Sequence, residues 1–113
     1  MKKILICDKN KALANFIKSK LSENFIVEKY NRRKFEMIKE SYLVCILIIY
    51  DKVDLFDLVT ITRYQKNIII GTSSKELIDF IKRSKHDIPF FDFRDSKNDI
   101  SLKLERLIYF FDE

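Results

Sequence analysis

The stretch Leu43-Val44-Cys45-Ile46-Leu47-Ile48-Ile49-Tyr50-Asp51 decides the fold of this 113-residue chain, because it is an unbroken apolar run that ends in a carboxylate. A shorter run of the same kind, Ile4-Leu5-Ile6-Cys7, ends at Asp8. Such runs are typical of strands buried on both faces of a parallel sheet. Open α/β sheets place their ligand crevice at the carboxyl ends of these strands. Both acids are therefore expected at one edge, where carboxylates can chelate a divalent cation or accept a phosphoryl group.

Strand and helix patterns alternate along the whole sequence. Strands are predicted at residues 3–7, 25–30, 43–50, 67–71 and 88–93, and helices at 10–23, 31–40, 55–64 and after Ser73 and Ser96. Strict alternation with short connections predicts one doubly wound α/β domain over residues 1–113. Right-handed crossovers favour a flavodoxin-like, five-stranded parallel sheet in the order 2-1-3-4-5, with about five helices and a short third helix.

Several polar side chains are predicted to begin the helices. The predicted N-caps are Asn10, Asn31, Ser73 (in a capping box with Glu76) and Ser96. In the second helix, Phe35 and Ile38 are expected to face the core. The only histidine, His86, follows the fourth helix and is interpreted as a surface loop residue.

Composition narrows the class of protein. A single glycine excludes a glycine-rich phosphate loop, and no apolar stretch reaches membrane-spanning length. Cys7 and Cys45 lie inside apolar strands, which indicates reduced thiols in a cytoplasmic protein.

The net charge of +5 is unevenly distributed along the chain, since residues 1–40 hold eleven Lys and Arg against five Asp and Glu. A basic face is expected there, and without a motif that mixes aromatic and basic residues it is interpreted as a solvated surface rather than a nucleic-acid site. Its members are Lys18, Lys20, Lys29, Arg32, Arg33 and Lys34.

The chain resembles a response-regulator receiver domain at the ends of its strands. Lys2-Lys3-Ile4-Leu5-Ile6-Cys7-Asp8-Lys9 is similar to the family's start, although Lys9 stands where the family has a second acid. The resemblance makes Asp51 the phosphoacceptor candidate, and Thr72 and Arg94 the candidates for switch and phosphate contacts. Asp51 and Thr72 are closer in sequence than in the family, so the resemblance implies that the third helix and the loop before it are shortened. The resemblance therefore implies an atypical, degenerate receiver.

Lys9 bears directly on the expected chemistry. Aspartyl phosphorylation in receivers uses Mg²⁺, and an ammonium in place of a carboxylate opposes the metal. Asp8 and Asp51 are thus candidate metal ligands with weak or absent Mg²⁺ binding. Lys9 is expected either to lie between Asp8 and Asp51 or to point to solvent. Arg94 is expected to bind phosphate, to pair with Asp51, or to lie exposed in its loop.

Three functions are open at this stage. The leading one is a signalling protein-protein interaction module, without enzymatic activity, cofactor or phosphorylation requirement, whose partner is a histidine kinase or a downstream protein. The resemblance places its interface, including a possible homodimer, on the fourth helix, fifth strand and fifth helix, where Leu102, Tyr109 and Phe110 fall outside the core pattern. The alternatives are a receiver phosphorylated on Asp51 with Mg²⁺, and a phosphotransfer enzyme that uses Cys7. Whether the chain stands alone or is part of a longer regulator is also open.

Overall fold

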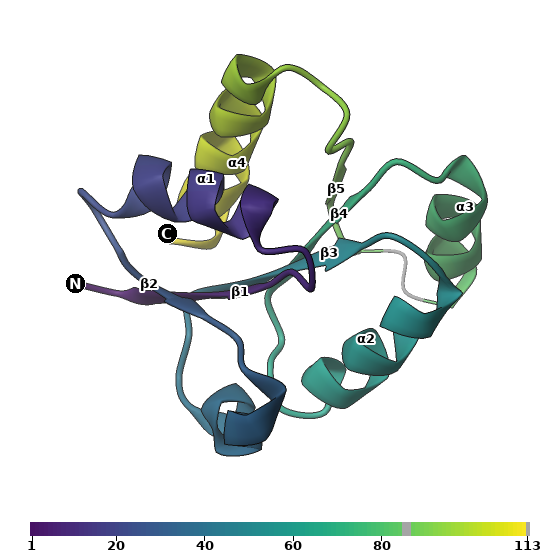
Figure 1. Ribbon diagram of the computed structural model, residues 1–113, viewed down its shortest axis with the longest axis horizontal. Helices are drawn as coiled ribbons and strands as arrows, with labels where there is room; N and C mark the ends of the chain where they lie inside the picture. The colour runs from purple at the N-terminus through teal and green to yellow at the C-terminus, as the bar shows by residue number, and fades with distance from the viewer. Residues whose placement is uncertain (85–86, 113) are drawn as a thin grey trace.

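A computed structural model describes residues 1–84 and 87–112 of the chain. Five parallel strands form one sheet in the order β2-β1-β3-β4-β5, as predicted (Figure 1). Their bounds are β1 Lys3–Cys7, β2 Ile26–Lys29, β3 Val44–Ile49, β4 Ile68–Thr72 and β5 Phe90–Phe91. The three central strands are buried along nearly their whole length, and β2 alternates because it lies at an edge. The carboxyl ends of β1 and β3 are neighbours, so Asp8 and Asp51 emerge at the same edge.

Helical segments cover both faces of the sheet. They are α1 Ala12–Leu21, η1 Arg32–Lys39, η2 Lys52–Asp54, α2 Leu55–Thr62, α3 Lys75–Ser84 and α4 Lys97–Phe111, where η marks a 3-10 helix. α1 and α4 lie together on one face, and η1, α2 and α3 lie on the other (Figure 1). Each face buries its own apolar cluster against the sheet, centred on Ile46 on the first face and on Leu47 on the second. The predicted doubly wound architecture is therefore confirmed. Within the described ranges, no helix has both the length and the apolarity that crossing a membrane requires.

Two predicted caps differ from the structure. α1 begins at Ala12 rather than near Asn10, and its N-cap is Lys11, whose φ of 61° lies in the left-handed region. The Asp8 carboxylate satisfies donors there, since Oδ2 accepts the Ala14 N–H at 2.9 Å. α3 is capped by Ser74 rather than Ser73, because the Ser74 hydroxyl accepts the Leu77 N–H at 3.2 Å. The predicted caps at Asn31 and Ser96 are confirmed by their bonds to Arg33 N–H and Asp99 N–H.

The segment after β2 is not the regular helix that the sequence predicts. It is a 3-10 segment with non-helical backbone at Lys34. Ile38 is fully buried as predicted, but Phe35 is 39% exposed and packs edge-on against Tyr64 instead of entering the core. The kink at Lys34 breaks the 3.6-residue period on which the prediction for Phe35 depends. β5 is also shorter than predicted, with two residues paired to β4.

The single glycine of the chain lies in β4, between β3 and the edge strand β5. A Cβ atom on Gly71 in β4 would stand 2.3 Å from the Phe91 ring and 2.9 Å from the Ile48 side chain. Glycine is required at this position for close packing rather than for an unusual backbone angle. The prediction for His86 falls outside the described residues.

Candidate functional site

Asp8 directly follows β1, and three hydrogen-bond donors bind its carboxylate. Its Oδ1 accepts the Tyr50 hydroxyl at 2.6 Å and the Asn10 N–H at 3.0 Å, while Oδ2 accepts the Ala14 N–H. Tyr50 directly follows β3, so this bond joins the ends of the two adjacent strands. Burial and the bond to Asp8 raise the pKa of the Tyr50 phenol, which therefore remains a proton donor at neutral pH.

Lys9 lies between two carboxylates that follow β3. Its Nζ is 2.9 Å from Asp51 Oδ2 and 3.3 Å from Asp54 Oδ1. The sequence predicts Lys9 either between Asp8 and Asp51 or pointing to solvent. In the structure its partners are Asp51 and Asp54, because Tyr50 and the start of α1 bind Asp8. The ammonium also lies 5.7 Å from the centre of the Tyr50 ring, within cation-π range.

Asp54 is a buried acid that the sequence reasoning missed. It is 2% exposed, and its Oδ2 accepts the backbone N–H groups of Tyr50 at 2.8 Å and Asp51 at 3.2 Å. The Asp51 carboxylate in turn accepts the Val53 N–H at 3.0 Å, so residues 51 and 54 form a reciprocal capping box at η2. An acid three residues after another acid at a strand end is the sequence signal that points to this box.

Lys9 and Asp51 each shift the pKa of the other. The hydrogen bond from Lys9 holds the pKa of Asp51 below its ordinary value of 3.8. The same bond raises the pKa of Lys9 above 10.5. Both groups are therefore ionised at neutral pH, and the ion pair is present across the physiological range.

The donor set does not fit a Mg²⁺ ion of the kind that receivers use. Mg²⁺ takes six oxygen ligands in near-octahedral geometry. Here one Asp51 oxygen faces the Lys9 ammonium, the other accepts an N–H, and Asp8 is turned toward Tyr50 and α1. Among the described residues, no group of three or more His, Cys, Asp or Glu side chains is arranged to hold a metal ion.

The other two candidate residues lie apart from the lysine and its acids. Thr72 is fully buried at the end of β4, and its Oγ1 accepts the Ser74 N–H at 3.3 Å. Arg94 donates to the Ser73 carbonyl at 3.2 Å and lies 3.6 Å from Asp92, with its side chain 70% exposed. Of the alternatives for Arg94, the structure shows the exposed loop arginine, without an ion pair to Asp51 among the described residues.

Cys7 lies at the end of β1 but lacks the features of a reactive thiol. It is 4% exposed, and burial raises the pKa of the thiol well above 9.0. A nucleophilic cysteine needs an accessible thiolate in an electropositive setting. The geometry therefore gives no support to phosphotransfer through Cys7.

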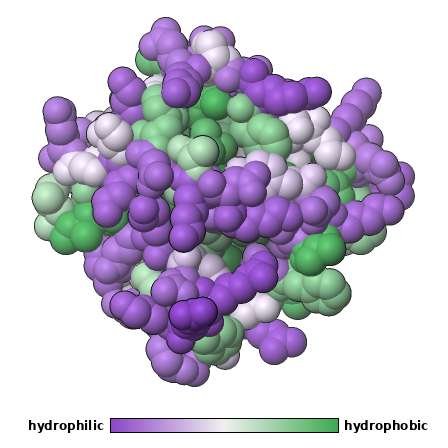
Figure 2. Space-filling view, viewed as in Figure 1, coloured by the Kyte–Doolittle hydropathy of each residue, from purple (hydrophilic) through white to green (hydrophobic). Residues whose placement is uncertain are grey.

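Apolar side chains are exposed on two helices. On α4, Leu102 is 47% exposed, Tyr109 56% and Phe110 69%. The sequence reasoning missed a second exposed stripe, Val53, Phe56 and Val59 on η2 and α2, of which Phe56 is 75% exposed. Figure 2 shows one face of the molecule, largely hydrophilic, with hydrophobic side chains in separate patches.

The solved structures that resemble this chain include two that share its architecture. No protein-family model and no curated protein matches the chain. The structure described as the adenylate cyclase from Rhodopirellula baltica superposes with a TM-score of 0.68 at 18% identity, over 98% of this chain and 90% of that one. The receiver domain of the Francisella response regulator 1452 superposes with a TM-score of 0.66 at 19% identity, over 96% and 98%. With its parallel sheet in the order 2-1-3-4-5, the chain has the fold of a response-regulator receiver domain.

Proposed function

We propose that this chain is an atypical receiver that acts as a cytoplasmic, non-enzymatic signalling module and binds a protein partner without being phosphorylated. One observation carries the proposal, namely the Lys9 ammonium between Asp51 and Asp54, at 2.9 and 3.3 Å. A receiver switches because a phosphoryl group interacts differently with its two conformations. A cation tethered at the acceptor holds the carboxylate in one ionised, hydrogen-bonded arrangement, and so favours one conformation permanently.

The alternative, a receiver that is phosphorylated on Asp51, has one observation in its favour. The Asp51 side chain is 53% exposed, so a small phosphodonor can reach it. Attack on the donor needs an available Asp51 oxygen, whereas one oxygen faces Lys9 and the other accepts the Val53 N–H. The developing charge also needs a metal for which the donor set is unsuited. The exposure of Asp51 is therefore weaker evidence for phosphorylation than the Lys9–Asp51 ion pair is against it.

Treatment with acetyl phosphate and Mg²⁺, read by intact mass, separates the two functions. We expect the parent protein to gain no phosphoryl group, and its Lys9 and Asp51 amide resonances to stay unchanged in a Mg²⁺ titration. Lys9→Asp should bind Mg²⁺ measurably, since it returns a carboxylate to the site. A phosphoryl group on the parent that is absent from Asp51→Asn would overturn the proposal in favour of the alternative.

For the partner surface, we infer the face formed by α3, β5 and α4. Tyr109 and Leu102 lie opposite the buried stripe of α4, and Phe80 on α3 is 55% exposed. Aromatic side chains left outside the core are typical of interfaces. A histidine kinase, a downstream protein or a second copy of the chain each fits such a surface.

Sedimentation velocity on matched variants tests the self-association arm. If two copies associate through this face, Phe110→Ser should raise the dissociation constant. Phe56→Ser removes an equally exposed ring from α2 and should leave association unchanged. The reverse result would place the interface on α2, and acetyl phosphate should alter neither value.

A further inference from the structure

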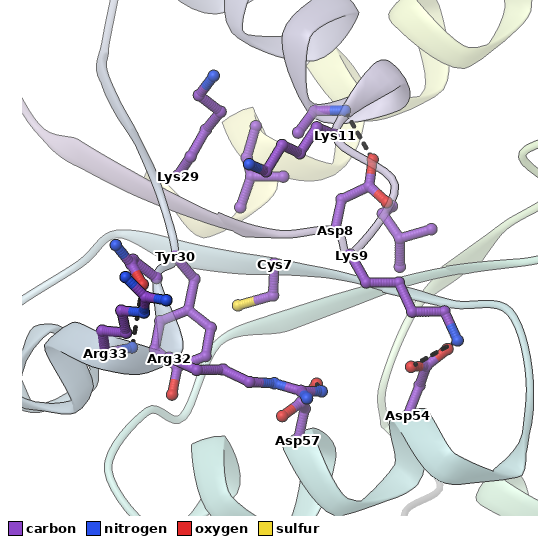
Figure 3. A pocket seen from close by; sticks show the side chains of 14 residues that line it. Cys7, Asp8, Lys9, Lys11, Lys29, Tyr30, Arg32, Arg33, Asp54 and Asp57 are labelled. Atoms are coloured by element: carbon purple, nitrogen blue, oxygen red, sulfur yellow. Dashed lines mark hydrogen bonds and ion pairs between the residues drawn. The ribbon is translucent and has the colours of Figure 1, made fainter.

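A pocket opens beside the lysine cluster, at the carboxyl ends of β1 and β2. Its volume is about 660 Å³, within the range of small-molecule sites. Figure 3 shows Lys11 and Lys29 on the side of the sheet that carries α1, and Arg32 and Arg33 on the side that carries η1. The pocket therefore lies across the carboxyl end of β1 and adjoins the β1/β3 junction, which is the topological switch point at which doubly wound folds bind ligands.

Three cations around this pocket have no acidic partner. Among the described residues, Lys11, Lys29 and Arg33 form no ion pair with a carboxylate, and all three are exposed. Lys29 donates one hydrogen bond to the Asn15 side chain at 2.8 Å, which leaves two of its N–H groups for a ligand. Like charges gathered on one concave surface repel each other, and an anion between them relieves that repulsion.

The acids that line the pocket are already engaged. Asp57 accepts from Arg32 at 2.7 Å, and Asp54 pairs with Lys9. Asp8 is covered by its bonds to Tyr50 and to the backbone at the start of α1. Ion pairs neutralise Asp57 and Asp54, whereas Asp8 keeps its charge and occupies the Ala14 N–H in the first turn of α1. An anion in the pocket must therefore be held by side-chain cations.

The floor of the pocket is uncharged. The Cys7 thiol, which burial keeps protonated, lines the pocket on the face of the sheet that carries η1, and Ile6 and Ile48 line it on the face that carries α1. Tyr30 adds an aromatic wall, and burial raises the pKa of its phenol, so it too is neutral. A ligand that combines an anionic group with a less polar body fits both halves of this lining.

We propose that this pocket binds a small phosphomonoester, with the phosphate held by Lys11, Lys29 and Arg33. Arg33 supplies a planar fork that matches phosphate oxygens, and the two lysines supply point charges. A volume of about 660 Å³ suits a sugar phosphate or a nucleotide rather than a nucleic-acid strand, which needs an extended groove. Asp51 does not line the pocket, whereas Lys9 and Asp54 do, so the proposed site adjoins the acceptor position of receivers without including it.

Titrations of the whole chain with ribose 5-phosphate, inorganic phosphate and ribose, followed by amide resonances, test the site. We expect both phosphates, but not ribose, to shift the resonances of Lys11, Lys29 and Arg33. Lys29→Gln and Arg33→Gln should each weaken ribose 5-phosphate binding by about tenfold, the effect of losing one charged hydrogen bond. These side chains are exposed, so thermal midpoints should report intact folding.

The matched control is Lys18→Gln, which removes the same charge from the exposed side of α1 outside the pocket. It should leave the affinity unchanged within about twofold, as expected for a distant screened charge. Equal losses in Lys18→Gln and Arg33→Gln would show non-specific attraction and overturn the proposal. Phosphate-induced shifts confined to other residues, or no shift at all, would also overturn it. If a phosphoserine peptide binds more tightly than ribose 5-phosphate, the proposal of a small-molecule ligand is overturned in favour of a phosphorylated protein.

Discussion

Replacing Asp54 by alanine should destabilise the fold more than any other single change at the acidic cluster. The carboxylate is 2% exposed and accepts two backbone N–H groups at the end of β3, from Tyr50 at 2.8 Å and Asp51 at 3.2 Å. Each hydrogen bond to a charged group contributes about 1.5–3 kcal/mol. After the change, water can hydrogen-bond to the N–H of Asp51, which is exposed, whereas the N–H of Tyr50, which is half-buried, is left largely without a hydrogen-bond partner.

The expected loss is therefore about 2–4 kcal/mol in the free energy of unfolding, with one bond lost fully and one in part. For a chain of this size about 1 kcal/mol corresponds to roughly 4 °C, so the thermal midpoint should fall by about 8–16 °C. Urea denaturation followed by far-ultraviolet circular dichroism measures the first quantity, and a thermal scan measures the second.

A second variant separates the backbone bonds from the lysine contact. In Asp54→Asn the amide oxygen can keep both N–H bonds at the Oδ2 position, while its NH₂ group faces Lys9 in place of Oδ1. This variant should lose about 1 kcal/mol, because neutral hydrogen bonds replace charged ones. Asp79→Ala on the exposed side of α3 is the control and should change stability by less than about 0.5 kcal/mol. If Asp54→Ala also stays within that limit, the buried capping box does not stabilise the end of β3.

Three further outcomes are expected. Gly71→Ala should cost about 1–3 kcal/mol of stability in urea denaturation, because its methyl group overlaps the Phe91 ring. Lys9→Met should raise the pKa of Asp51 toward 3.8 in a carboxyl carbon NMR titration. Because the Asp51 pKa is lower in the folded state than in the unfolded state, the Lys9–Asp51 pair stabilises the folded protein above the unfolded pKa. This stabilisation is lost as the pH falls through the folded pKa. Lys9→Met lacks it, so acid unfolding below pH 3.8 should begin at a higher pH in this variant. Cys7 should react with a thiol reagent in the native protein only at the rate of unfolding or local opening, and unchanged labelling rates in urea would contradict its burial.

The sheet could be predicted from the sequence because its central strands are apolar on both faces. β1, β3 and β4 are short apolar runs of five or six residues between turn signals, a length typical of buried parallel strands rather than of helices. The order of the strands followed from alternation and crossover handedness. The 3-10 segment η1 was not predictable in the same way, since its form depends on a backbone kink at Lys34 that no period encodes.

The site could be predicted only in part. Sequence position places Asp8, Lys9 and Asp51 at neighbouring strand ends, but it does not decide which carboxylate the lysine approaches. That choice depends on Tyr50, whose hydroxyl binds Asp8, and on Asp54, which η2 turns back under the strand end. The phosphate pocket was hidden for a related reason, because its cations come from three segments that meet only when β2 pairs with β1.

A tethered cation differs from a bound metal in one respect that matters for signalling. A metal ion exchanges with solvent, so its occupancy, and that of a phosphoryl group beside it, can change with conditions. Lys9 is covalently attached just after β1 and stays at a fixed local concentration beside Asp51. A ligand shifts a conformational equilibrium only through different affinities for the two states, and a group that is always present cannot report a signal. If this chain responds to a signal at all, the response must enter elsewhere, and the cationic pocket beside Asp8 is the part of the described structure best suited to receive one.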